Sequence, residues 1–322
     1  MRAIVLYVLQ RLAWAATVSA AAAAMTFLLV RLAPGNPVSI LAGELSTPEY
    51  QEALVRRLGL DQPLWVQLVR YFEQLLEGDL GYSFTYHAPV SAVIGARVAP
   101  TLLLMGVTLT ISMALGVWIG VRSAVGSGTL RWRTAGVLTL VGFSLPGFWL
   151  GQILILVFSV WLGWFPALGS ASDSDAAGID RVLDVAWHLV LPAATISVVQ
   201  VTLISRLTRA AMLEALGADY IVAARGKGVG PRRLTWRHAF RNALLPVVTV
   251  FGLELGWLVA GFVVVETVFS WPGLGSLTAS AIDARDYPVI TGLFLVITLS
   301  VVLANLLTDL LYLAIDPRIR VG

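Results

Sequence analysis

Apolar residues in this chain are grouped in long runs, not spread at the spacing of a soluble helix or strand. Six runs are long enough to cross about 30 Å of hydrocarbon as helices. They cover about residues 12–30, 101–121, 135–163, 189–207, 244–265 and 288–313. The pattern therefore predicts an all-α integral membrane protein with six transmembrane helices. No internal repeat divides the chain, so we expect a single membrane domain over residues 1–322.

Residues 31–99 form a polar segment between the first two runs. Ser46 and Glu49 have the spacing of a capping box, which predicts a helix ending at Gly59. A second helix is expected to end at Gly78. Its apolar side chains share one face: Trp65, Leu68, Val69, Phe72, Leu75 and Leu76. The two helices would form a small helical cap whose apolar face either packs on the bundle or lies in the membrane interface.

The third run contains Pro146 and Gly147 near its middle. Proline removes one helical hydrogen bond and clashes with the preceding turn. We therefore expect a kink in the third span. The run is also too long for a helix that is both straight and upright in the membrane.

Residues 214–246 form the longest strongly basic stretch of the chain. A helix-sized piece, residues 219–227, lies between two natural stops. Asp219 is expected to accept hydrogen bonds from the first turn, and Gly228 to end the helix in the left-handed conformation. Arg225 and Lys227 fall in the last turn, where the helix dipole favours cations.

Pro231 then suits the first turn of a further helix. Two stripes at four-residue spacing follow it, one basic and one apolar. They consist of Arg233, Arg237 and Arg241, and of Trp236, Phe240 and Leu244. Such an amphipathic helix is expected on a membrane surface, with its cations toward water or anionic headgroups.

Composition and charge agree with a membrane protein and give its orientation. The chain is 58% hydrophobic and only 13% charged, against about 25% charged in soluble domains. With both termini inside, 15 of the 22 Lys and Arg residues fall in inner segments. Positive residues favour the cytoplasmic side, so we expect cytoplasmic termini and a cytoplasmic 214–246 loop.

The sequence offers no constellation for catalysis. There is no cysteine, and the three histidines lack metal-ligand spacing. The single Gly226-Lys227 pair lacks the other residues of a phosphate-binding loop. We therefore expect no enzymatic activity, no metal and no cofactor, and energy supplied by a partner or by an ion gradient.

Glu254 lies deep in the fifth run, where a charge is costly and often functional. It either faces the substrate pathway or makes a polar contact between helices. Ser144, Gln200 and Trp257 are the other pathway candidates, although polar residues in spans more often join helices. Asp309, in the sixth run, is expected to pair with a nearby arginine.

The turn at residues 271–275 contains Trp271, Pro272, Gly273 and Gly275 and is not expected to be regular helix. Non-helical backbone at membrane depth survives where protein or a water-filled cavity covers it. Two interpretations remain: a re-entrant turn that closes the outer end of a pathway, or an ordinary outer turn.

Residues 219–228, followed by 241–246, resemble the cytoplasmic signature loop of ABC-importer permeases. The resemblance is to the dipeptide, oligopeptide and nickel branch, and to its first-permease (B-type) subunit. Val222 stands where the general motif has Glu, and the gap before Leu245-Pro246 is longer. Matching signatures recur in order at residues 34–37, 78–83, 162–166, 269–275 and 316–320.

The resemblance implies a permease subunit of an ATP-driven importer of di- and oligopeptides in the bacterial cytoplasmic membrane, working by alternating access. It implies a second homologous permease, two ATPase subunits (or one as a homodimer) and an extracytoplasmic binding protein as partners, with membrane lipid and no nucleic acid. The implied ATPase-coupling residues are Asp219, Tyr220, Ala223, Ala224, Arg225, Lys227 and Gly228. The alternatives are a nickel chelate or another small solute as substrate, and an ion-gradient-driven transporter centred on Glu254.

Overall fold

The computed structural model describes residues 2–32, 47, 61–83, 85–126, 129, 145–172 and 178–315. Four described helices are long and apolar enough to cross a membrane: Gln10–Leu28, Val90–Val125, Gly178–Gly217 and Tyr287–Leu306. The predicted helix ending at Gly59 and residues 135–144 of the third run lie outside the described residues. The chain forms two compact units, built mainly from Met1–Val98 with Leu277–Val302, and from Ala99–Ser276 with Leu303–Arg320.

The first unit contains two long helices and two shorter ones. Its elements are α1 (Arg2–Leu32), α4 (Leu64–Leu76), β1 (Tyr82–Ser83), β2 (Ala88–Pro89), the start of α5 (Val90–Val125), most of α12 (Leu274–Asp283) and the first half of α13 (Tyr287–Ile315). The helix α4 confirms the second helix predicted in the polar segment. It ends where expected, since Gly78 has φ +80°.

A two-stranded sheet fastens this unit at one point. The strands β1 and β2 are antiparallel, with Ser83 opposite Ala88. The hydroxyl of buried Ser83 donates a 2.5 Å hydrogen bond to Asp286 Oδ2. Asp286 directly precedes α13, and its Oδ1 accepts the Val289 N–H at 3.4 Å. The signature at residues 78–83 therefore holds the start of α13.

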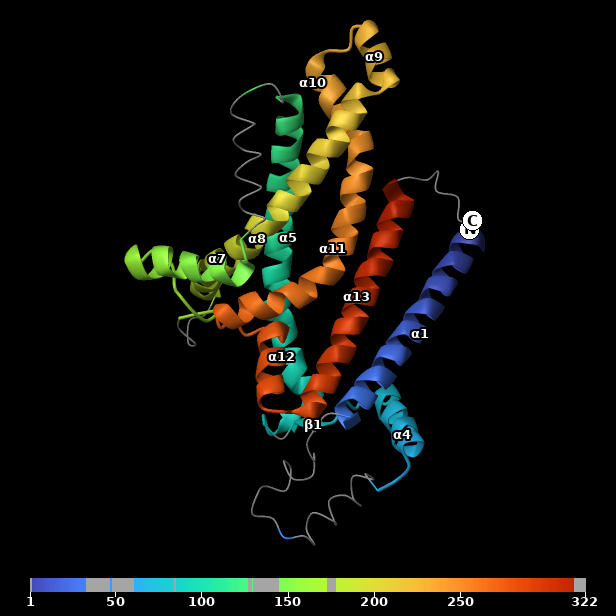
Figure 1. Cartoon of the computed structure of the whole chain (residues 1–322), viewed down its shortest axis with the longest axis vertical. Helices are drawn as coiled ribbons and strands as arrows, with labels where there is room; N and C mark the ends of the chain where they lie inside the picture. Colours follow the sequence, from blue (N-terminus) through green and yellow to red (C-terminus); the bar gives the residue numbers. More distant parts are fainter. Residues whose placement is uncertain are drawn as a thin grey trace. The chain divides into compact units, whose positions relative to one another are not determined.

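The second unit is a helical bundle (Figure 1). Its elements are the rest of α5, α7 (Gly147–Leu154), the π-helix η1 (Ile155–Trp161), α8 (Gly178–Gly217), α9 (Asp219–Gly226), α10 (Pro231–Arg233), the π-helix η2 (Leu234–Ala239), α11 (Phe240–Val268) and the start of α12 (Leu274–Asp283). The helices α8 and α11 pack along each other, and α7 contacts both. At about 1.5 Å per residue, the 29 residues of α11 span roughly 43 Å.

Two glycines bring α5 against α8. A Cβ on Gly116 would lie 2.7 Å from Ile204 Cβ, and one on Gly120 would lie 2.5 Å from Thr208 Cβ. Both positions therefore require glycine, because the helices approach too closely for a methyl group. The four-residue spacing of small residues carried this signal in the sequence.

The expected kink at Pro146 is instead the start of a helix. Pro146 has extended backbone, with φ −60° and ψ 131°, and α7 begins at Gly147. Proline fits at this N-cap position because the N–H groups at the start of a helix have no partner within the helix, so the N–H that proline lacks is not needed there. The turn after η1 is fastened to the bundle by a 2.8 Å hydrogen bond from the Gly169 N–H to the Phe269 carbonyl.

Candidate functional site

The short helix α9 ends in a complete Schellman motif. Gly228 adopts the expected left-handed conformation, with φ +77°. Its N–H donates to the Arg225 carbonyl at 3.0 Å, and the Val229 N–H donates to the Ala224 carbonyl at 3.2 Å. These two bonds satisfy carbonyls that the last turn leaves free. The predicted helix and its stop are confirmed.

The start of α9 differs from the prediction. The N-cap residue is Ala218, and within the described residues no side-chain hydrogen bond caps the helix. Asp219 is the first helical residue and is exposed. Its carboxylate therefore favours the helix through the dipole at the N-terminus, and the predicted cap was wrong by one residue.

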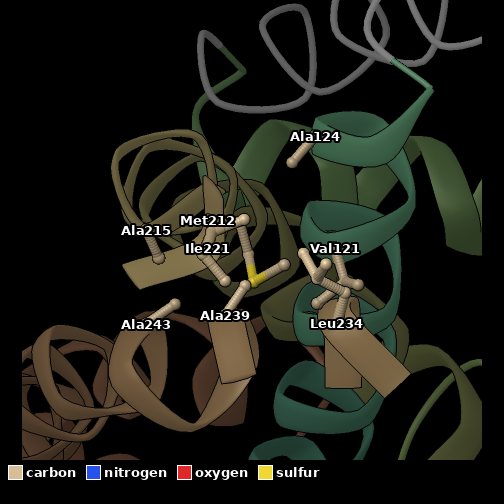
Figure 2. Packing of buried hydrophobic residues seen from close by; sticks show 8 residues of the cluster. All are labelled: Val121, Ala124, Met212, Ala215, Ile221, Leu234, Ala239 and Ala243. Carbon is tan, nitrogen blue, oxygen red and sulfur yellow. The ribbon is translucent and has the colours of Figure 1, made fainter. Parts of the chain in front are cut away.

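One side chain anchors α9 to the rest of the unit. Ile221 is fully buried in an apolar cluster that joins α9 to four other segments of the chain (Figure 2). The cluster consists of Val121 and Ala124 from α5, Met212 and Ala215 from α8, Ile221, Leu234 and Ala239 from η2, and Ala243 from α11. A force on α9 therefore reaches all three long helices of the unit through packed side chains.

The remaining surface of α9 is open in the described structure. Tyr220, Val222 and Ala223 are exposed, although all three are largely apolar. Ala224 is half-buried, while Arg225 and Lys227 are exposed at the C-terminal end. The helix thus presents a small apolar patch between an acidic first turn and a basic last turn.

The segment after Gly228 is one continuous helical stretch rather than a separate surface helix. Pro231 occupies the first helical position, as predicted. The six residues of η2 then form a π-helix, which has wider turns than an α-helix. Leu234, Ala239 and Ala243 are buried, at spacings of five and then four residues. The predicted basic stripe of Arg233, Arg237 and Arg241 is exposed as expected. The predicted apolar stripe is not the buried one, because Trp236 is exposed and Phe240 is only half-buried.

At the other end of α11 the chain turns back into the unit. Trp271 is fully buried in a cluster with Leu104, Leu189, Ala193 and Phe262. Its indole N–H donates to the Pro100 carbonyl at 3.0 Å. A tryptophan that is buried and also hydrogen-bonded fixes both the depth and the direction of this turn.

A buried glutamate holds the turn together. Glu266 is fully buried near the end of α11. Its Oε1 accepts the Thr101 hydroxyl at 2.7 Å, and its Oε2 accepts the N–H groups of Gly275 at 2.7 Å and Ser276 at 3.1 Å. Its carboxyl group therefore occupies the N-terminus of α12, where free N–H groups need acceptors.

The glycines of this turn leave room for that carboxyl group. A Cβ on Gly273 would overlap the Glu266 carboxyl group, and one on Gly275 would lie 2.5 Å from Val263 Cα. Residues 271–273 are non-helical as predicted, whereas Leu274 and Gly275 begin α12. The sequence prediction was therefore too long at its C-terminal end. It also gave no role to Glu266, which directly follows the predicted fifth run.

Gln200 is the one pathway candidate whose side chain is among the described residues. Gln200 is half-buried on α8. Ser144 and the side chains of Glu254, Trp257 and Asp309 lie outside the described residues. Among the described residues, no group of three or more His, Asp or Glu side chains is arranged to hold a metal ion.

Family models cover nearly the whole chain. The model described as "binding-protein-dependent transport system inner membrane component" matches residues 112–321. The model for the N-terminal part of such membrane components matches residues 4–105. The first match contains both α9 and the turn held by Glu266.

Curated relatives match along most of their length. The chain is 41% identical over 315 residues to the dipeptide transport system permease protein of Escherichia coli K12, covering 92% of this chain and 93% of the relative. It is 39% identical to a glutathione transport system permease protein of Salmonella paratyphi A, covering 98% of both. A di/tripeptide transport system permease of Pseudomonas aeruginosa is 41% identical.

Solved structures share the fold at low sequence identity. A chain of the MetNI methionine ABC transporter, in an inward-facing conformation, gives a TM-score of 0.57 at 19% identity, covering 70% of this chain and 96% of that one. A chain of an amino acid ABC transporter gives 0.51 at 14% identity, covering 69% and 94%. These matches establish the permease fold.

Proposed function

This chain belongs to the family of binding-protein-dependent transport system inner membrane components, and from that premise we propose that it is a permease subunit of an ATP-driven importer of small peptides. It is a membrane-embedded transport subunit and not an enzyme. The substrate class rests on the relatives, which are named for dipeptide, di/tripeptide and glutathione transport. The partners are a second permease, two ATPase chains and an extracytoplasmic binding protein.

The orientation follows from charge. The basic residues of the 214–246 loop and of both termini favour the cytoplasmic side. With this orientation α9 faces the compartment that holds ATP, and the turn at Trp271 lies toward the outside. The nickel-chelate and ion-gradient alternatives have no described contact in their favour.

The observation that carries the coupling role is the division of α9 into two sides. Ile221 is buried in the cluster shared with α5, α8 and α11, while Tyr220, Val222 and Ala223 are exposed. We propose that the exposed side fills a cleft on an ATPase chain. Asp219, Arg225 and Lys227 flank that contact, Ala224 lies at its buried edge, and Gly228 sets the direction in which the chain leaves.

The turn of Trp271, Pro272, Gly273 and Gly275 is proposed to close the outer end of the pathway in the outward-closed state. A buried, hydrogen-bonded turn holds its position better than an exposed loop does. The pathway roles of Ser144, Gln200, Glu254 and Trp257 remain predictions from the sequence.

The test enlarges the exposed side of α9 without touching its anchor. Ala223→Trp should block docking, so the tagged variant, purified in mild detergent from its native membrane, should lose its ATPase chains and cells should lose peptide uptake. Leu213→Trp is the matched control, since Leu213 is also exposed but lies on α8. It should retain both. Wild-type uptake and a full set of ATPase chains with Ala223→Trp would overturn the coupling role of α9.

A further inference from the structure

The outer helix α4 carries an apolar arc that is covered along only half of its width. At about 100° per residue, the apolar side chains other than half-buried Val66 span an arc of roughly 160°. In order around the helix they are Tyr71, Leu64, Leu75, Leu68, Phe72, Trp65, Leu76 and Val69. Apart from Leu64, the first helical residue, those before Trp65 are half-buried, whereas Trp65, Leu76 and Val69 are exposed.

One edge of the covered half, Tyr71, lies against the end of α1. The rings of Phe27 and Tyr71 stack with centroids 5.4 Å apart. Burial raises the pKa of Tyr71 to about 12, because the phenolate would lose its hydration there. Phe27 falls in the last turn of the apolar segment Gln10–Leu28. The contact therefore places α4 at the level where this span leaves the hydrocarbon.

The open half of the arc is strongly apolar. Leu76 is 88% exposed, Trp65 69% and Val69 50%. On α1, Met25 and Leu28 are also exposed in the same turn as Phe27. The lipid-facing surface of the span and the open half of α4 therefore meet at one depth, which is the depth that tryptophan favours in membranes.

The charges on the polar side of α4 indicate how the helix would bind a membrane. It carries one cation, Arg70, and two acids, Glu73 and Glu77, together with the amides of Gln67 and Gln74 and the half-buried Val66. An excess of cations would indicate attraction to anionic headgroups. This composition instead indicates insertion of apolar side chains into the interface, without a requirement for anionic lipid.

We propose that the open half of the α4 arc (Trp65, Val69 and Leu76) lies in the membrane interface, with these side chains among the upper acyl chains of the lipid. The assignment of this contact to the outer leaflet rests on the proposed function, whereas the contact with lipid itself does not. The interfacial helix keeps the outer segment of the chain at the membrane surface, beside the end of α1.

The absence of cysteine from the sequence makes the test direct. Single cysteines at Val69, Leu76 and Trp65 would each carry a spin label in the full complex, reconstituted in phosphatidylcholine nanodiscs. Accessibility to oxygen, which partitions into lipid, is compared with accessibility to a water-soluble nickel chelate. We expect oxygen to exceed the chelate at all three positions and the order to reverse at Gln74→Cys, the control on the exposed polar side of the same helix.

Two results would overturn the proposal. Labels at Val69 and Leu76 with the chelate accessibility of the Gln74 label would place the arc in water. Labels that neither reagent reaches would mean that protein covers it. Because three positions are labelled, the remaining two still test the proposal if one variant fails to reach the membrane. A chain that purified without ATPase chains would contradict the importer but would leave the two accessibilities unchanged, so the two failures are distinguishable.

Discussion

The two ends of α11 are held in opposite ways. At the cytoplasmic end proposed here, α9 is anchored by one apolar side chain, Ile221, and finished by a backbone motif around Gly228. At the other end, the turn before α12 is anchored by a carboxyl group, an indole and a hydroxyl that all hydrogen-bond inside the unit. The first end exposes most of its side chains, and the second buries nearly all of them.

The difference agrees with the roles proposed for the two ends. A surface that another chain binds has to leave its side chains free, so its anchor is confined to one side. A turn that holds a fixed position against the bundle gains from buried hydrogen bonds, which are costly to break when one partner is removed. The same kinds of substitution should therefore have unequal effects at the two ends.

Removal of a carboxyl group should give the largest difference in stability between the two ends of α11. Glu266→Ala leaves the Thr101 hydroxyl and the N–H groups of Gly275 and Ser276 without their acceptor, at a cost of about 3 kcal/mol in stability. Asp219→Ala removes an exposed carboxylate at the start of α9 and should cost about 0.3–1 kcal/mol. Thermal unfolding of the two purified variants measures the difference. Equal midpoints would show that the buried network contributes little.

An added methyl group should give the next largest contrast. Gly275→Ala places a Cβ 2.5 Å from Val263 Cα, so α12 must move away from α11, at a cost of about 1–3 kcal/mol. Gly226→Ala on α9 is the matched control, because its Cβ would meet no described atom within 4 Å. That variant should be neutral or more stable by up to about 1 kcal/mol. Gel filtration in detergent and thermal unfolding report both, and a stable Gly275→Ala would contradict the close packing.

The local signals of the first end were readable from the sequence. A short helix between residues 219 and 227, the left-handed Gly228 and Pro231 at a helix start are decided within a few residues, and all were predicted. Which side of α9 is buried was not, because Ile221 is selected by the direction in which the chain leaves α8. The buried stripe of the π-helix was not predicted either, because the prediction assumed the four-residue spacing of an α-helix.

The second end was less predictable because it depends on contacts between distant segments. Glu266 meets Thr101 across 165 positions of sequence, and no local pattern pairs them. A glutamate at the end of an apolar run, followed by a Pro-Gly turn and a glycine-serine helix start, is the signal that remained unread. The glycine spacing at positions 116 and 120 was likewise readable, but only the structure shows α8 as the helix it approaches.

A substitution whose strain is confined to the end of α9 should have the most specific effect on transport. Gly228→Val forces a β-branched residue into φ +77°, at a cost of roughly 1–3 kcal/mol confined to the end of α9. A Cβ there meets no described atom within 4 Å, so the strain is in the backbone alone and the chain should still reach the membrane. The helix would leave at a changed angle, and ATP hydrolysis in proteoliposomes should continue while peptide uptake per ATP falls. Gly228→Asn, which tolerates the left-handed conformation, should restore most of that ratio, whereas an unchanged ratio with Val would show that the exit direction of α9 does not matter for coupling.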